Sequence, residues 1–254
     1  MLEKIADVVG LGPEDRVVEI GAGVGNLTEV LAARSGRVVA IEADKGLYEI
    51  LCESVGNLPN VEVLFEDGLK LDYRSFLRRW GHPYRIVANL PFSISTPILF
   101  HLIPQRDAFQ SLHLTFQREV ANRIIAKPAT RDYSVLSVMV QVFMDPRIVL
   151  SIPSTCFFPR PKVAASLVHF SVRPKPAVPI SDEDRFQAVV RAAFGQRRKI
   201  LLNALRGAAG LRLSSAQAEA ACAIAQIDPR RRGESLDLSE FSRLTEAIGR
   251  ILYS

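Results

Sequence analysis

The chain has few cysteines and histidines, which limits the kinds of site it could contain. Its 254 residues include three cysteines and four histidines. The cysteines are odd in number and far apart, so they indicate neither a disulfide framework nor a zinc site, and the histidines share no metal-ligand spacing. We therefore predict no metal site. Cys222 lies in an alanine-rich stretch and is expected in the core.

Long apolar runs, repeats and low-complexity segments are also missing. No uncharged apolar run is long enough to span a bilayer. Glu3, Lys4 and Asp7 interrupt the first apolar stretch, unlike a secretory signal peptide. No repeat is found at a period of about 20 to 50 residues. The sequence is typical of a globular protein without a membrane anchor, and we expect it in the cytoplasm.

What the chain does contain is apolar material and an excess of positive charge. The sequence is 48% hydrophobic, which is enough for one large core and a smaller second domain. Its formal net charge is +5. A basic surface favours a polyanionic partner such as a nucleic acid.

Three glycines follow the first predicted strand. Residues 17–20 are typical of a strand, residues 21–25 contain the glycines, and an amphipathic helical stretch runs to about Ala33. This pattern predicts the first βα unit of a nucleotide-binding sheet, in which glycines let the backbone approach a ligand. Asn26 stands where a dinucleotide fingerprint has its third glycine, so no pyrophosphate need be bound.

Acidic residues follow the next two predicted strands. Residues 37–41 are followed by Glu42, and residues 61–65 by Glu66 and Asp67. An acid that closes the second strand can accept hydrogen bonds from both hydroxyls of a ribose, and an acid after the third can accept one from an adenine amino group. The two strand ends together therefore predict a pocket for adenosine.

The fourth predicted strand, residues 84–88, leads into Asn89-Leu90-Pro91-Phe92. This tetrapeptide suits a planar amine. The side-chain oxygen of Asn89 and a neighbouring backbone carbonyl can accept both hydrogens of an exocyclic amino group, while the ring of Phe92 stacks on the base. A flipped adenine is a substrate with this chemistry.

These four strand ends resemble the ordered motifs of class I S-adenosylmethionine-dependent methyltransferases. Longer elements narrow the resemblance to the ribosomal RNA adenine N6,N6-dimethyltransferases, in particular their bacterial small-subunit members. Those elements are residues 94–97, 116–123, 157–163 and 190–199, and the match spans nearly the whole chain. The family usually has Tyr at position 92, where Phe92 keeps the stacking face without the hydroxyl.

The resemblance implies an α/β fold with a Rossmann-like class I methyltransferase sheet, mostly parallel and of about seven strands, and a small C-terminal all-helical domain. S-adenosylmethionine is the implied cofactor. The implied activity is N6,N6-dimethylation of two adjacent adenosines in a hairpin loop near the 3′ end of small-subunit ribosomal RNA, during ribosome biogenesis. The expected partner is an immature small ribosomal subunit of the 30S type, and the protein is expected to be a monomer.

The resemblance also assigns roles to residues at matching positions. Cofactor binding is predicted for Glu19, Gly21, Ala22, Gly23, Glu42, Ala43, Asp67, Gly68 and Asn89. Catalysis is predicted for Asn89, Leu90, Pro91 and Phe92. RNA binding is predicted for Arg160, Lys162, Arg197, Arg198, Lys199, Arg230, Arg231 and Arg232.

A proline-rich segment, residues 173–179, marks the predicted domain boundary. We predict a cofactor-binding catalytic domain at 1–176 and a helical RNA-binding domain at 177–254. A last helix is expected from about Asp237. Helical spacing predicts buried faces that contain Phe186, Val189, Val190, Ala193, Phe194, Phe241, Leu244 and Ile248.

Members of the family carry a further segment of roughly twenty residues or more, with a Gly-Gln-Asn-Phe-Leu-like element, before the helix that residues 1–9 resemble. We expect a chain without it to bind cofactor weakly and to transfer methyl groups slowly. Three other interpretations stay open. They are a macrolide-resistance-type methyltransferase of large-subunit RNA, a DNA or protein amide methyltransferase, and a non-catalytic ribosome-assembly or transcription factor of the same fold.

Overall fold

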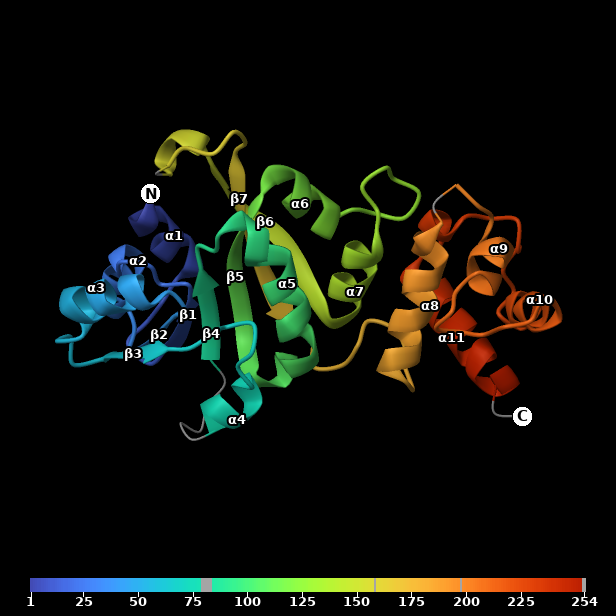
Figure 1. The fold of residues 1–254 in the computed structure, drawn as a ribbon, viewed down its shortest axis with the longest axis horizontal. Coiled ribbons are helices and arrows are strands. Elements are labelled where there is room, and N and C mark those ends of the chain that lie inside the picture. The colour runs from blue at the N-terminus through green and yellow to red at the C-terminus, as the bar shows by residue number, and fades with distance from the viewer. Residues whose placement is uncertain (79–83, 158, 197, 253–254) are drawn as a thin grey trace. The chain divides into compact units, whose positions relative to one another are not determined.

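The computed structural model describes residues 1–78, 84–157, 159–196 and 198–252 (Figure 1). Its strands are β1 (Arg16–Ile20), β2 (Arg37–Glu42), β3 (Val61–Phe65), β4 (Tyr84–Ala88), β5 (Phe109–Gln117), β6 (Met144–Ile152) and β7 (Ala165–Val172). Its helices are α1 (Leu2–Val9), α2 (Asn26–Ala32), α3 (Lys45–Val55), α4 (Tyr73–Arg78), α5 (Phe92–Leu102), α6 (Arg118–Ile124), α7 (Val135–Phe143), α8 (Glu183–Gly195), α9 (Leu201–Arg206), α10 (Ser215–Ile224) and α11 (Leu238–Leu252). Short 3-10 helices are η1 (Ile103–Ala108), η2 (Ser154–Cys156) and η3 (Gly233–Ser235).

The chain divides into two compact units. The first comprises Met1–Ala121 and Asp145–Val172, and the second comprises Asn122–Met144 and Arg173–Ser254. No helix in the described part of the chain is long and apolar enough to cross a membrane.

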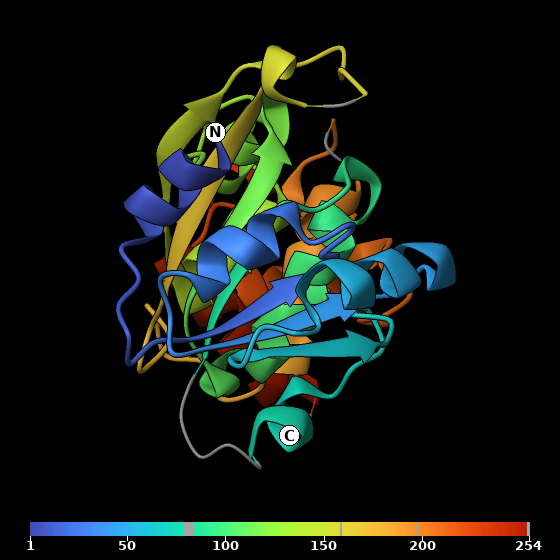
Figure 2. The ribbon, with the colours of Figure 1, turned by 90° about the vertical axis from the view of Figure 1, so that its left-hand side faces the viewer.

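The first unit contains a seven-stranded sheet with the order β3-β2-β1-β4-β5-β7-β6 (Figure 2). The pairs from β3 through β5 are parallel, and β7 runs antiparallel to β5. This confirms the predicted fold class, a mostly parallel Rossmann-like sheet. Because parallel neighbours end at the same edge, the loops after β1, β2 and β4 lie next to one another there.

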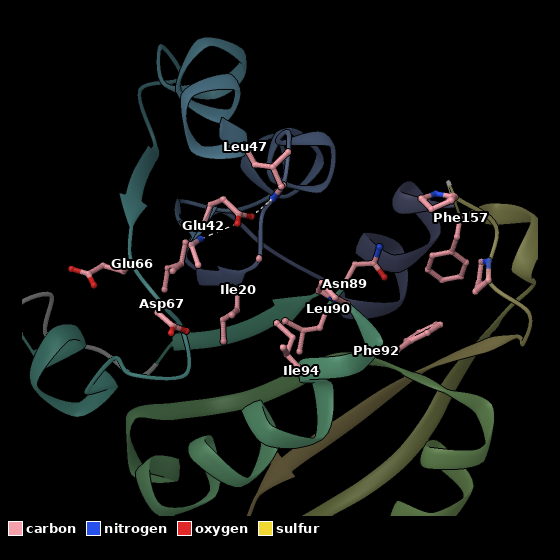
Figure 3. A pocket seen from close by; sticks show the side chains of 18 residues that line it. Ile20, Glu42, Leu47, Glu66, Asp67, Asn89, Leu90, Phe92, Ile94 and Phe157 are labelled. Carbon is pink, nitrogen blue, oxygen red and sulfur yellow. Dashed lines mark hydrogen bonds between the residues drawn. The ribbon is translucent and has the colours of Figure 1, made fainter. Parts of the chain in front are cut away.

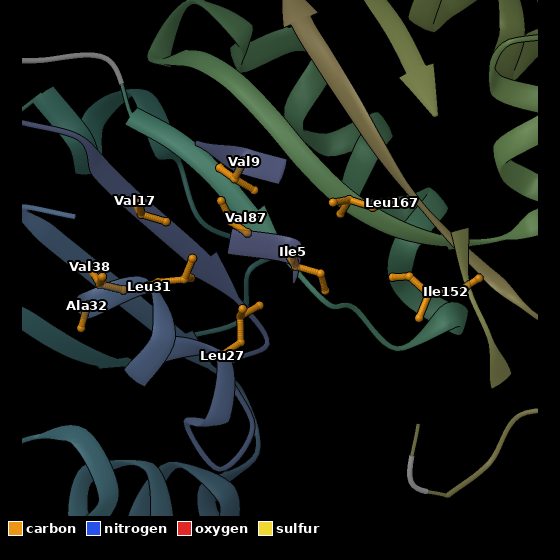
Figure 4. Close-up of a cluster of buried hydrophobic side chains, with 11 residues drawn as sticks. Ile5, Val9, Val17, Leu27, Leu31, Ala32, Val38, Val87, Ile152 and Leu167 are labelled. Atoms are coloured by element: carbon orange, nitrogen blue, oxygen red, sulfur yellow. The ribbon is translucent and has the colours of Figure 1, made fainter. Parts of the chain in front are cut away.

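Helices cover the sheet on the side that Val17 faces. Val17 of β1 and Val87 of β4 pack with Ile5 of α1 and with Leu27 and Leu31 of α2 (Figure 4). All five are less than 5% exposed. The period-2 alternation of a strand sends Val18, the next residue, to the other face, where it is equally buried. A sheet covered on both faces explains why its strands are apolar throughout.

On the opposite face, the turn after β3 approaches the sheet closely. A Cβ added at Gly68 would lie 2.7 Å from Cγ2 of Ile20 and 3.6 Å from Cδ1 of Ile98 in α5. Tyr73 at the start of α4 donates a hydrogen bond from its hydroxyl to the Gly68 carbonyl at 3.0 Å. Only glycine fits at position 68, which brings the turn against the end of β1.

The regular elements of the second unit are helices, and Met144 is the only strand residue among its described residues. The predicted buried face of α8 is confirmed for Phe186, Val189, Val190 and Ala193, while Phe194 is half-buried. In α11 the prediction is confirmed for Phe241. The ring of Phe194 stacks on that of Phe241, with the ring centroids 6.0 Å apart.

The second unit also includes a segment from the middle of the chain, Asn122–Met144. Tyr133, only 1% exposed, packs edge-on against Phe194 with the centroids 5.7 Å apart. The backbone N–H of Ala129 donates to the carbonyl of Glu234 at 2.8 Å. The two compact units therefore differ from the predicted division between residues 176 and 177. The reason is that α7 packs on α8, a helix that comes much later in the sequence. The predicted division into functional domains stays a prediction.

Candidate functional site

A cavity of about 500 Å³ lies at the carboxyl edge of the sheet in the first unit (Figure 3). Four loops at the ends of β1 to β4 and the segment after η2 form its wall. The lining residues are Ile20, Gly21, Gly23, Ile41, Glu42, Ala43, Leu47, Glu66, Asp67, Gly68, Asn89, Leu90, Pro91, Phe92, Ile94, Phe157, Pro159 and Pro161. All four predicted catalytic residues and seven of the predicted cofactor residues therefore meet in one cavity.

The glycine loop after β1 contains backbone conformations that residues with a Cβ rarely adopt. Gly21 and Gly23 have φ of 71° and 62°, in the left-handed region. Both glycines line the cavity and, having no side chain, present bare backbone to it. The backbone can approach a ligand there without a Cβ in the way.

Glu42 joins the glycine loop to the end of β2. Its Oε2 accepts a hydrogen bond from the Gly23 N–H at 2.8 Å, and its Oε1 accepts from the N–H groups of Ala43 and Asp44, each at 2.9 Å. Glu42 is only 7% exposed, and the carboxylate still lines the cavity. The two oxygens keep acceptor capacity for a ligand hydroxyl beyond these three bonds.

Asp67 lies at the other end of the cavity from the aromatic side chains (Figure 3). Its Oδ1 accepts from the Leu69 N–H at 3.0 Å, and its Oδ2 lies 3.2 Å from the Lys70 ammonium. The Leu69 hydrogen bond, with the help of Lys70, holds the pKa of Asp67 below its usual range. The carboxylate therefore stays charged and able to accept a hydrogen bond from an amino group.

Glu19, a predicted cofactor residue, lies beneath the glycine loop and does not line the cavity. It is 2% exposed and accepts a hydrogen bond from the hydroxyl of Thr28 at 2.6 Å. Burial raises its pKa to about 8; the Thr28 bond opposes the shift and the charge of Glu42 adds to it. Ala22 also lies outside the cavity lining. Cofactor contact by these two residues stays a prediction.

Asn89 follows β4, and a residue of β5 holds its carboxamide. The Thr115 hydroxyl donates to Oδ1 of Asn89 at 2.9 Å, and Thr115 is fully buried. This bond uses one lone pair of the amide oxygen and leaves the other for a ligand. Pro91, two residues after Asn89, has φ of −53° and is the N-cap residue of α5. The rigid Pro91 fixes the turn from β4 into α5.

Two aromatic rings stand together at one end of the cavity (Figure 3). The centroids of Phe92 and Phe157 are 6.1 Å apart, with 60° between the ring planes. Both side chains are half-buried. A flat base that stacked on the face of one ring would therefore meet the other ring at an angle.

The predicted RNA-binding residues occupy several positions. In the first unit, Arg160 and Lys162 are exposed beside the cavity wall, and Nε of Arg160 donates to the Ser154 hydroxyl at 3.3 Å. In the second unit, Arg198, Lys199 and Arg232 are exposed. Arg230 pairs with Asp228 at 3.2 Å, and Arg231 pairs with Glu240. Arg197 lies outside the described residues.

Two contributors to the site were not assigned a role from the sequence. Thr115 alternates with apolar neighbours as any strand residue does, so no local pattern marks it. Phe157 falls in an element that carries the family resemblance, which is a signal that could have found it. Among the residues that the structure describes, no three His, Cys, Asp or Glu side chains are arranged to hold a metal ion.

Comparison with known proteins gives a consistent match over the whole chain. The family profile of "Ribosomal RNA adenine dimethylase" matches residues 1–247. A Moorella thermoacetica protein named "Ribosomal RNA small subunit methyltransferase A" is 44% identical over 255 residues, which cover 98% of this chain and 88% of the relative. A Geobacter metallireducens protein of the same name is 42% identical, with 98% and 90% covered.

Solved structures agree with the fold. A dimethyladenosine transferase from Plasmodium falciparum aligns with a TM-score of 0.76 at 25% identity, covering 98% of this chain and 95% of that one. The 23S rRNA methyltransferase ErmE aligns with a TM-score of 0.68 at 25% identity, covering 98% and 96%.

Proposed function

Because the chain belongs to the ribosomal RNA adenine dimethylase family, we propose that it dimethylates N6 of two adjacent adenosines near the 3′ end of small-subunit ribosomal RNA. It is an S-adenosylmethionine-dependent ribosomal RNA adenine methyltransferase. The observation that carries the proposal is the cavity in which Asn89-Leu90-Pro91-Phe92 faces Glu42 and Asp67. The names of these two bacterial relatives favour the small subunit over the large one.

The cavity residues fit S-adenosylmethionine. Glu42 would accept hydrogen bonds from the ribose hydroxyls, and Asp67 would accept one from the adenine amino group. The bare backbone of Gly21 and Gly23 leaves room for the amino-acid end. When bound, the cofactor supplies an electrophilic methyl group on a sulfonium.

Asn89 would orient the amine that is to be methylated. Its Oδ1 and the Leu90 carbonyl would accept the two amino hydrogens of adenine, so that the nitrogen lone pair is directed away from them. Both acceptors also favour the positive charge that develops on the nitrogen. The Thr115 hydroxyl occupies one lone pair of the Asn89 oxygen, and the second lone pair would accept the substrate hydrogen.

Phe92 and Phe157 would hold the extruded base. Stacking on one aromatic ring contributes about 1–3 kcal/mol, comparable to the few kcal/mol that flipping a base out of its stack costs. Phe92 lies next to the amine-binding Asn89 and Leu90 in the chain. The Phe92 ring would therefore place the base plane and Phe157 would border the base, while the tetrapeptide positions its amino group.

We further infer that the partner is an immature small ribosomal subunit, and that the protein acts on it as a monomer in the cytoplasm. The exposed Arg160 and Lys162 beside the cavity support an RNA partner, because phosphates attract cations at the mouth of such a site.

Methyl-labelled S-adenosylmethionine and undermethylated small ribosomal subunits provide the test. We expect label on N6 of two adjacent adenosines, mapped by mass spectrometry of RNA fragments. Label in large-subunit RNA instead would favour a resistance-type enzyme. Cofactor binding without any label on either RNA would contradict the proposed activity.

A further inference from the structure

A second hollow lies wholly within the helical unit and is polar. Its volume is about 580 Å³. The lining residues are Lys199, Asn203, Arg206, Gly207, Leu213, Ser214 and Ser215. Two of the seven are cations, and Asn203 and Ser214 carry side-chain groups that can donate hydrogen bonds. The hydroxyl of Ser215 donates to Glu219 at 3.5 Å. Such a lining is suited to an anion.

The two cations come from α9 and from the segment before it. Lys199 lies before the N-cap Ile200, outside the helix, and Arg206 is the last helical residue. Asn203 and Arg206, three residues apart, share one helix face. The opposite face is anchored in the core, since Leu201 and Leu205 are fully buried. The packing of α9 therefore fixes the polar side toward the hollow.

No carboxylate in the described part of the chain pairs with Lys199 or Arg206. In the second basic cluster of the sequence, residues 230–232, two arginines do have carboxylate partners. Arg230 pairs with Asp228, and Arg231 donates to both oxygens of Glu240. Two unpaired cations in one hollow repel each other unless an anion binds between them.

The far wall of the hollow is the start of α10. Ser214 caps that helix, because its hydroxyl accepts from the Gln217 N–H at 3.2 Å and its own N–H donates to the Gln217 side chain at 2.9 Å. Ser215 follows in the first turn. The hydroxyl hydrogen of Ser214 is left to donate into the hollow, and the positive end of the helix adds to the potential of the cations.

We propose that this hollow binds a backbone phosphate of the ribosomal RNA, with Arg206 and Lys199 as its charged contacts. The proposal rests on the proposed function for the identity of the RNA. Arg206 lies outside the basic clusters that the sequence marks, and the fold alone brings it beside Lys199. A backbone phosphate fits because the hollow is open and Lys199 and Arg206 are exposed.

Binding to purified small ribosomal subunits, measured at several salt concentrations, tests the proposal. Arg206→Ala is expected to weaken binding several-fold and to lower the slope of log affinity against log salt by about one, since one fewer counterion is released. Lys199→Ala with Arg206→Ala should lower it by about two. Arg206→Lys should retain most of the slope, because it keeps the charge.

Arg250→Ala is the matched control. Arg250 is exposed in α11 of the same unit and does not line the hollow. The Arg250→Ala protein is therefore expected to bind subunits with the wild-type slope. Circular dichroism and cofactor affinity should be unchanged in every variant. Equal loss of slope in the Arg206→Ala and Arg250→Ala proteins would overturn the proposal, as would failure of the wild-type protein to bind small subunits.

The two failures are distinguishable. Normal methylation of small subunits together with a wild-type salt slope for Arg206→Ala would refute the phosphate site and leave the proposed function standing. Loss of slope for Arg206→Ala with no methyl transfer by any variant would support the site and refute the activity.

Discussion

The side chain of Asn89 is held by Thr115, a residue on a neighbouring strand. The Thr115 hydroxyl donates to Oδ1 at 2.9 Å, which occupies one lone pair of the amide oxygen. The second lone pair is the acceptor that the proposed mechanism assigns to the substrate amine. The aromatic residue at position 92 supplies the stacking surface.

Substitutions in the tetrapeptide should separate chemistry from cofactor binding. Asn89→Ala is expected to abolish methyl transfer while cofactor affinity stays nearly intact, because the amine loses its positioning acceptor. Phe92→Ala should also be severely impaired. Phe92→Tyr is the control and should be close to normal, since it keeps the ring. Steady-state rates and calorimetric affinities are the measurements, and rapid turnover by Asn89→Ala would refute the mechanism.

Glu19 makes the stability of the first unit depend on pH. Its folded pKa, raised by burial to about 8, lies above the ordinary value of 4.5. The folded protein therefore holds a proton that the unfolded chain releases, and the stability contributed by this proton is present below pH 4.5 and lost as the pH rises through 8. Glu19→Gln removes the titration and keeps the Thr28 hydrogen bond.

We expect the melting temperature of the wild-type protein to fall relative to that of Glu19→Gln between pH 5 and pH 9, the range that contains the shifted pKa of about 8. Thermal unfolding across this range is the measurement. Parallel curves for the two proteins would show that Glu19 is already charged in the folded state.

At the scale of elements, the site depends on the connection between the glycine loop and β2. Glu42 makes that connection through the N–H groups of Gly23, Ala43 and Asp44. A side chain that closes one strand therefore also fixes the loop after its neighbour. Parallel strands allow this because their carboxyl ends share one edge.

Glu42→Ala should weaken S-adenosylmethionine binding by roughly 1–3 kcal/mol, since two ribose hydroxyls lose a charged acceptor. The melting temperature should also fall, because three backbone N–H groups lose their partner. Calorimetry and thermal unfolding measure the two effects. Glu29→Ala, an exposed acid on α2, is the control for charge and should change neither. Unchanged affinity in the Glu42 variant would mean that the ribose lies elsewhere.

For the whole molecule, the helical unit is not a continuous piece of chain. Asn122–Met144 supplies part of its packing. The clearest contact is Tyr133, which is buried against Phe194 at 5.7 Å between ring centroids. A fragment that begins at residue 177 lacks this segment and exposes the apolar surface beneath it.

We expect residues 177–254 alone to be much less stable than the same helices in the full chain. The dispersion of amide signals in NMR spectra and cooperative unfolding are the measurements. In the full chain, Tyr133→Ala should cost about 3–5 kcal/mol of unfolding free energy, as for other large aromatic truncations. Tyr133→Phe is the control: the buried hydroxyl has no hydrogen-bond partner among the described residues, so its loss should cost little. A stable, cooperative fragment would contradict the expectation.

The sequence by itself determined the first four strands, the order of the motifs and the cavity residues that follow each of these strands. These features are local: β-branched runs predict strands, and a residue directly after a strand must lie at the sheet edge. Asn89, Glu42 and Asp67 could therefore be assigned to one pocket before their positions were known.

Only the tertiary structure decided which distant residues support that pocket. Thr115 lies 26 residues from Asn89, to which it donates a hydrogen bond, and Glu19 accepts one from Thr28. Arg206 lies beside Lys199 because of the packing of α9. The same is true of Asn122–Met144, which packs with helices that begin some forty residues later. Contacts of this kind depend on how buried faces pack against each other, and no local spacing in the sequence encodes the result.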